Sequence, residues 1–205
     1  MITVRLAKTE AEAEALAPMV RDAFKDEDLG IDAYKRWYLR NGKCLIVAYD
    51  DRKAPLGYID YFPLTGTGDA RLVTGGSEGD IVPETDFTTP GSMKTANVAY
   101  LAGIVVASHG SEAGKDVTAA LMAGMAAHLK KYYGDRRVTL LGIAYSAEGG
   151  RIMRRMDGNV MVPGSQRKDG HDLYRVDLVP ELRQYVFETA VRRLARDRVD
   201  VWMEI

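Results

Sequence analysis

The feature that most constrains this chain is an apolar strand joined to an apolar helix by a short polar loop, within GIVVASHGSEAGKDVTAALM, residues 103–122. The strand residues are almost all small or aliphatic, which is typical of a strand buried on both faces. Apolar residues recur at helical spacing from Val117 onward, so we expect the helix to begin there. The loop between them contains Gly110, Gly114 and Lys115. Because the first turn of a helix presents unpaired N–H groups and a partial positive charge, this arrangement predicts an anion site.

The composition limits the classes of function. A chain of 205 residues is long enough to bury an ordinary core, and its formal net charge of −1 predicts no attraction to nucleic acid or to an anionic membrane. No apolar run approaches the roughly 20 residues needed to span a bilayer. The single cysteine, Cys44, lies in the apolar run CLIVAY, which favours a buried small hydrophobe over a reactive thiol. With no signal-peptide core, the chain is expected in the cytoplasm.

Local patterns in the first half predict a strand, two helices and a hairpin. The strand covers residues 2–7, and the first helix begins with a capping box made by Thr9 and Glu12. A short second helix ends at Gly42, and two strand-like runs then surround a turn at 50–55. Residues 65–93 are rich in Gly, Thr, Ser and Pro and show no sustained period. We expect a long loop or an insertion there, which either covers a substrate site or is passive.

The second half predicts a bulged strand, a helix, another strand, a short helix and a closing hairpin. Gly103 lies inside the first of these strands, and an isolated glycine there indicates a bulge or a close backbone approach. The helix that follows is expected to end at Gly134. Pro180 then opens an amphipathic helix whose apolar stripe is Leu182, Tyr185, Val186, Ala190, Val191 and Leu194. The apolar residues of the final VDVWMEI predict docking or dimerisation.

One interpretation of the loop is a nucleoside-triphosphate P-loop. GSEAGKD resembles G-x-x-x-x-G-K-[ST], but it is one residue short and has Asp116 where a hydroxyl should bind magnesium. The strand within residues 136–146 also lacks an acid for that metal. We therefore expect no triphosphate site in this loop.

The order of elements resembles that of the GNAT superfamily of acyl-CoA-dependent N-acyltransferases over residues 2–178. The resemblance implies an α/β fold of the α+β type, with a mixed, mostly antiparallel sheet flanked by helices, and residues 179–205 as an added C-terminal helix and tail. It further implies that the fourth strand splays from its neighbour. The pantetheine arm of acetyl-CoA, or of another acyl-CoA, would then pair with main-chain groups of Val106 and Ser108.

In that family the pyrophosphate is held by a loop of pattern [RQ]-x-x-G-x-[GA]. Aligning AALM with the small, apolar segment of the following helix places the pattern on Ala113, Gly114, Lys115, Asp116, Val117 and Thr118. Lys115 occupies a position that is often basic. Asp116 and Thr118 replace both motif glycines. An acid there is unfavourable, because like charges about 4 Å apart repel by roughly 1 to 4 kcal/mol.

The resemblance also bears on catalysis. Ser146 stands where the family often has an asparagine, and Met153 stands where it has the tyrosine that protonates the leaving thiolate, which a methionine cannot do. Tyr145 is the candidate substitute, with strand packing as the alternative. Asp60, between two tyrosines in GYIDYF, is the candidate general base, since such a carboxylate needs partners or a shifted pKa. The alternative for Asp60 is a solvent-facing edge residue.

These observations lead to two hypotheses for function. The first is an N-acyltransferase that acts on an amine of a small molecule or a protein, and the second is a catalytically degenerate GNAT-like binding or assembly protein. Arg151, Arg154 and Arg155 are candidates for binding an anionic substrate or the coenzyme's 3′-phosphate. The arginines of the last helix are expected to be solvated, and the helix is a candidate for homodimer contacts. The histidines lack ligand spacing, so no metal site is expected.

Overall fold

The computed structural model describes residues 1–23 and 31–205, with side chains described from residue 35 onward in the second range. Its strands are β1 (Ile2–Leu6), β2 (Leu45–Tyr49), β3 (Pro55–Pro63), β4 (Val98–Val106), β5 (Val138–Ile143), β6 (Asn159–Val162), β7 (Leu173–Leu178) and β8 (Val201–Glu204). Its longer helices are α1 (Glu10–Glu14), α2 (Ala17–Ala23), α3 (Ile31–Arg40), α4 (Gly66–Val73), α5 (Pro83–Asp86), α6 (Glu112–Tyr133), α7 (Ala147–Arg155) and α8 (Pro180–Arg196).

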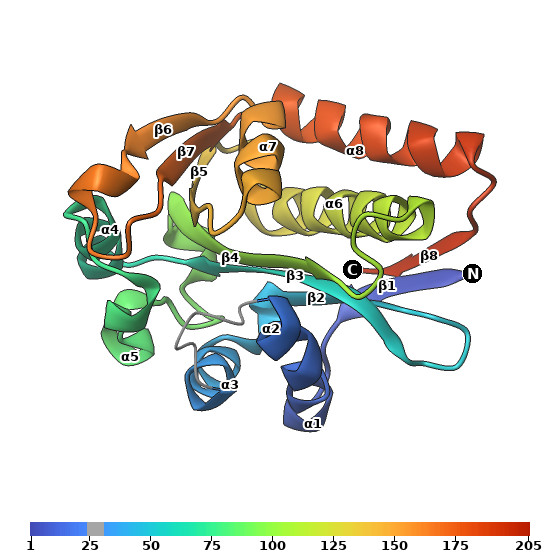
Figure 1. Ribbon diagram of the computed structural model, residues 1–205, viewed down its shortest axis with the longest axis horizontal. Helices are drawn as coiled ribbons and strands as arrows, with labels where there is room; N and C mark the ends of the chain where they lie inside the picture. The colour runs from blue at the N-terminus through green and yellow to red at the C-terminus, as the bar shows by residue number, and fades with distance from the viewer. Residues whose placement is uncertain (24–30) are drawn as a thin grey trace.

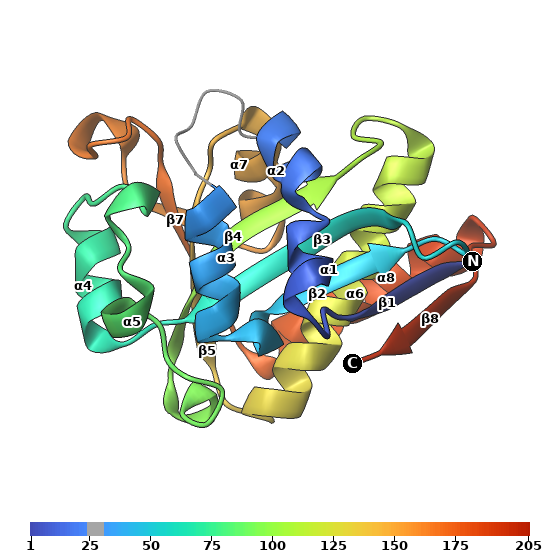
Figure 2. The same ribbon diagram turned by 90° about the horizontal axis from the view of Figure 1, so that it is seen from below.

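The strands form one mixed sheet in the order β6-β7-β5-β4-β3-β2-β1-β8. Within the described ranges, β4 with β5 and β1 with β8 are the parallel pairs, and the other neighbours are antiparallel. Figure 1 shows α6, α7 and α8 above this sheet and α1, α2 and α3 below it. Figure 2, seen from below, shows α1 and α3 lying across the sheet and α4 and α5 beside its β7 end. The predicted fold class is therefore confirmed.

The first half follows its local patterns closely. Thr9 caps α1 by accepting a hydrogen bond from the Glu12 amide, while the Glu12 carboxylate bonds the Lys8 amide instead of that of Thr9. The predicted hairpin is present as β2 and β3. The first helical segment is divided into α1 and α2, because Pro18 has no N–H group to continue the helical ladder.

Residues 65–93, predicted as a long loop or an insertion, contain secondary structure of their own. They form α4, α5 and short 3₁₀ turns. Thr65 caps α4 through the Gly68 amide, and Arg71 pairs with the fully buried Asp86 at 2.7 Å. The ion pair joins residues 15 apart in the chain, so a search for local periodicity does not detect it.

Helix α6 begins at Glu112 and not near Val117. Ser111 is its N-cap and accepts a hydrogen bond from the Gly114 amide at 2.9 Å. The apolar period begins later because the first turn is mostly exposed, and Val117 is the first large side chain to reach the sheet. The predicted end is confirmed, with Gly134 as the C-cap at a φ of +57°.

The C-terminal residues complete the same sheet. Helix α8 packs on α6, where the buried Arg183 donates hydrogen bonds to the carbonyls of Leu129 and Arg136. Tyr185 and Val191 of the predicted stripe remain exposed. The tail, for which docking or dimerisation was predicted, forms β8 beside β1, so that Trp202 is 61% exposed while its neighbours along the strand are half-buried. No helix in the described ranges is long and apolar enough to cross a bilayer.

Candidate functional site

A gap opens between β4 and β5. The two strands pair only where Val98–Tyr100 lies beside Thr139–Leu141. Strand β4 continues to Val106, whereas β5 ends at Ile143 and pairs along its whole length with β7 on its other side. Among the described strands, residues 101–106 therefore have a partner on the β3 side only. This is the splay that the resemblance implied.

A bulge in β4 accompanies the gap. Asp60 pairs with Gly103, but the next residue, Tyr61, pairs with Leu101, so Ala102 has no partner on β3. An unpaired residue of this kind bends its strand and increases the local twist. The bulge predicted at Gly103 is thus present one residue earlier, and it lies where β4 departs from β5.

Main-chain polar groups line the β4 side of the gap. The Ala107 amide donates to the Leu56 carbonyl at 3.0 Å, so the alternation of an antiparallel ladder turns the peptide groups of Ile104 and Val106 away from β3. Val106 was predicted, and Ile104 was missed. Ser108 lies in the following turn, where its carbonyl already accepts hydrogen bonds from the Ser111 amide and hydroxyl. The Ser108 carbonyl is therefore occupied within the loop.

The loop leads directly into α6. A Cβ atom at Gly114 would lie 2.2 Å from the Ser108 carbonyl oxygen, so the close approach of loop and helix requires glycine there. The amides of Glu112 and Ala113 lie in the first turn, where no helical carbonyl is available to them. Residues 113–118, expected as a loop, are instead the first two turns of α6.

Ion pairs compensate the acids at the start of α6. Asp116 pairs with Arg193 of α8 at 3.0 Å, and Glu112 pairs with Lys115 at 2.5 Å and with Arg193 at 3.1 Å. Lys115, followed by Arg193, lowers the pKa of Glu112. The repulsion expected from Asp116 is therefore reduced. Val117 packs against Gly57, and the Thr118 hydroxyl bonds the Gly114 carbonyl, so both side chains serve the helix.

Asp60 is the most buried acid near the gap. It is 1% exposed and lies on a central strand, so the alternative of a solvent-facing edge residue is wrong. Its Oδ1 atom has no hydrogen-bond partner among the described residues and lies near Gly103 and the Tyr58 ring. Burial, and next the charge of Glu78, raise the pKa of Asp60 well above its ordinary value, while the Gly103 amide acts in the opposite direction.

Glu78 was not identified from the sequence. It comes from the short 3₁₀ turn Glu78–Asp80 within the insertion and is 3% exposed. After burial, the charge of Glu78 is the largest cause that raises the pKa values of Asp60 and Tyr100. No local pattern marks Glu78, because its burial depends on where the insertion folds.

A buried arginine fixes that insertion. The Arg167 guanidinium, fully buried in the connection between β6 and β7, donates to the carbonyls of Leu72 and Gly76 at 3.0 and 2.7 Å. Asp169 pairs with the same group at 2.7 Å. The insertion and the β6–β7 connection are thereby held together in the part of the structure that presents Glu78.

The end of β5 supplies the other side of the gap. Met153 of α7 is buried and packs against Gly142 of β5. A Cβ atom added at Gly142 would lie 2.9 Å from the Met153 methyl group and would also be near the Leu101 carbonyl. A thioether therefore occupies the position where the resemblance implies an acid. Ser146 caps α7 through the Gly149 amide and is exposed. Tyr145 is half-buried with its ring centroid 4.7 Å from that of His171.

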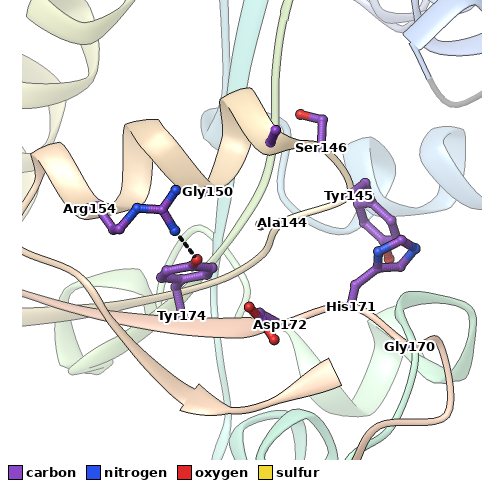
Figure 3. A pocket seen from close by; sticks show the side chains of 10 residues that line it. Ala144, Tyr145, Ser146, Gly150, Arg154, Gly170, His171, Asp172 and Tyr174 are labelled. Atoms are coloured by element: carbon purple, nitrogen blue, oxygen red, sulfur yellow. Dashed lines mark hydrogen bonds between the residues drawn. The ribbon is translucent and has the colours of Figure 1, made fainter. Parts of the chain in front are cut away.

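A pocket of about 390 Å³ lies between α7 and the start of β7, as Figure 3 shows. Its polar lining consists of Tyr145, Ser146, Arg154, His171, Asp172 and Tyr174. Arg154 was singled out from the sequence as an anion-binding candidate, whereas the residues from the start of β7 were not. In the residues that the structure describes, no group of three or more His, Cys, Asp or Glu side chains could hold a metal ion.

Comparison with known proteins identifies the fold. No family model matches the chain, and no curated protein matches it. Among solved structures, the loading GNATL domain of CurA from Lyngbya majuscula is similar with a TM-score of 0.62 and 13% identity, over 90% of this chain and 99% of that one.

Two further solved structures agree. A GCN5-related N-acetyltransferase from Kribbella flavida has a TM-score of 0.54 and 17% identity, over 86% of this chain and 98% of that one. The diaminobutyrate acetyltransferase EctA from Paenibacillus lautus has a TM-score of 0.53 and 12% identity, over 86% and 95%. The chain therefore has the GNAT fold.

Proposed function

We propose that the chain transfers an acetyl or other acyl group from coenzyme A to an amine of a small molecule or protein. The observation that carries this proposal is the gap beside β4, which is lined by peptide groups turned away from β3 and leads to the start of α6. Solved structures with the same fold include acetyltransferases, and that of EctA is described as a complex with coenzyme A and its amine substrate.

An acyl-CoA fits the residues around the gap. The amides of a pantetheine arm would pair with the turned peptide groups of Ile104 and Val106, as an added strand pairs with a sheet edge. The pyrophosphate would bind the amides of Glu112 and Ala113, with Lys115 as a neighbouring cation. Gly114 would serve this site indirectly, since it allows the loop to approach the helix.

The reaction needs few side chains. The amine nitrogen attacks the thioester carbonyl carbon, the C–S bond breaks, and the sulfur leaves as a thiolate that takes up a proton. Asp60 would accept the proton of the amine, directly or through a water molecule. Orientation of the two substrates in the gap would supply much of the acceleration, since good alignment can contribute roughly 7 to 11 kcal/mol.

The acceptor would be drawn to the site as a cation. Asp60 and Tyr58 lie on the face of the sheet that α1 and α2 cover, opposite to α6. A buried carboxylate such as Asp60 favours a positively charged ligand, because a nearby cation stabilises its ionised form. We therefore propose that the amine approaches Asp60 from this face.

Isothermal titration with acetyl-CoA and a thiol-release assay against a panel of amines test the proposal together. Binding with amine-dependent release of thiol supports the enzyme. No binding of any acyl-CoA would refute it.

A second candidate is a binding or assembly protein that keeps the fold without transfer, favoured by Met153 at the gap. Substitution Met153→Tyr tests it, with Met153→Phe as the control of equal bulk. If the chain is an enzyme, turnover by Met153→Tyr should be about tenfold higher than turnover by Met153→Phe. A well-placed general acid contributes more, roughly 10² to 10⁴ in rate. Acetyl-CoA binding with no turnover in either variant would support the second candidate.

Cytoplasmic location and self-association through α8 stay predictions. Tyr185, 60% exposed on α8, would lie in a contact between two copies of the chain. Analytical ultracentrifugation of the protein and of Tyr185→Ser tests this proposal, because a dimer built on α8 should dissociate more readily in the variant.

A further inference from the structure

We propose that the pocket between α7 and the start of β7 is a second binding site, for a small zwitterion of the amino-acid type. The ligand would carry one ammonium group and one carboxylate. The proposal concerns binding alone and does not rest on acyl transfer.

The pocket has the size and walls of a ligand site. Its volume of about 390 Å³ falls in the range of roughly 300 to 1,000 Å³ for small-molecule pockets. The α7 residues that line it, Ala147, Gly150 and Arg154, follow helical spacing along one face. Met153, beside the gap, is not among them. Helix α7 therefore presents one face to the pocket and another to the gap.

Two opposite charges line this pocket without pairing. The Arg154 guanidinium donates to the Tyr174 hydroxyl at 2.6 Å, and the Asp172 carboxylate accepts from the Gly164 amide at 2.8 Å. Neither charge forms an ion pair with the other or with any other residue in the described ranges. Each is thus oriented by a neutral partner, and its charge is left for a ligand.

The arrangement defines the chemistry of that ligand. Arg154 has further N–H donors for a carboxylate, and the second oxygen of Asp172 is suited to an ammonium group. Figure 3 shows Arg154 and Tyr174 at one side of the pocket and Tyr145 and His171 at the other. A molecule with only one charge would leave the opposite pocket charge uncompensated, so both groups are required.

Calorimetric titration of the chain with the common L-amino acids, without coenzyme A, tests the proposal. We expect at least one to bind at millimolar concentration or below. Its decarboxylated amine and its deaminated acid should each bind about tenfold or more weakly, as loss of one charge-assisted contact predicts.

Variants locate the binding. Asp172→Asn keeps an oxygen for the Gly164 amide and removes only the charge, and Arg154→Gln removes the guanidinium. Each should weaken binding about tenfold or more. Arg52→Gln, exposed in the turn between β2 and β3 and outside the pocket lining, is the control of equal charge change and should leave affinity unchanged.

Three results would overturn the proposal: no binding by any amino acid, equal binding by the singly charged analogues, or unchanged affinity in a folded Asp172→Asn protein. Titration of the same proteins with acetyl-CoA separates this outcome from failure of the proposed function. Loss of zwitterion binding with retained acetyl-CoA binding would place the defect in the pocket.

Discussion

Asp60 and His128 are both buried titratable groups, and they lie on opposite faces of the sheet. His128 of α6 bonds the Tyr61 hydroxyl through its Nδ1 atom, and burial lowers its pKa to about 3. Asp60 has a pKa raised well above its ordinary value. The Nε2 atom of His128 and the Oδ1 atom of Asp60 are both buried without a hydrogen-bond partner in the described structure.

The surroundings of His128 and Asp60 differ. His128 lies in the packed layer between α6 and the sheet, next to the Tyr132 ring. Asp60 lies at the bulge of β4, where the sheet opens. A shifted pKa is therefore weak evidence for catalysis by itself, and it gains value where a substrate can reach the group. We assign His128 to the core and Asp60 to the site.

Loss of Asp60 should have the largest effect on transfer. In Asp60→Asn, kcat/KM for amine acylation should fall by roughly 10² to 10⁴, the usual contribution of a general base. His128→Phe should stay within a few-fold of the unsubstituted chain in the same thiol-release assay. Equal losses of activity in the two variants would contradict the assignment of Asp60 to the site and His128 to the core.

The acid side of the stability profile should depend on His128. A histidine whose pKa falls from 6.5 to about 3 on folding favours the folded state above pH 6.5. That stability should be lost as the pH falls, by about 4 kcal/mol at pH 3. Below pH 6.5 the free energy of unfolding, measured with urea, should therefore change less with pH in His128→Phe than in the unsubstituted chain. The same pH dependence in both proteins would contradict a buried, neutral His128.

The change in the free energy of unfolding between pH 4 and pH 8 should depend on Asp60. An acid whose folded pKa is raised stabilises the folded state most below its ordinary pKa of 3.8, and this contribution is lost as the pH rises through the folded value. Asp60→Asn should therefore lose less stability than the unsubstituted chain between pH 4 and pH 8. Parallel urea-unfolding profiles for the two proteins would show that Asp60 ionises as freely as an exposed acid.

The smallest effect is expected at the start of α6. Lys115→Glu should weaken acetyl-CoA binding about fivefold, because Lys115 is half-exposed and already pairs with Glu112. Lys131→Glu, at the far end of the same helix, is the control of equal charge change. Equal affinities in the two variants would place the pyrophosphate elsewhere.

The sequence predicted those features that local chemistry decides. Thr9 as a cap, the hairpin of β2 and β3, the bulge near Gly103 and the end of α6 at Gly134 each depend on residues close together in the chain. The buried state of Cys44 followed from its apolar neighbours. Together with the order of elements, these features were enough to indicate the fold.

The sequence did not predict features that depend on distant partners. Asp60 is buried because its strand is central and α1 and α2 cover its face of the sheet, and Glu78 is buried because Arg167 fixes the insertion. The pocket beside α7 combines residues from α7 and β7, and β8 forms only because β1 offers an open edge.

By itself, then, the sequence determined which segments form strands and helices, because capping, turn geometry and apolar period act over a few residues. Only the tertiary structure decided which polar groups lose contact with water. Burial depends on packing between elements that are distant in the chain, and burial is what shifts the pKa of Asp60 and creates a candidate site.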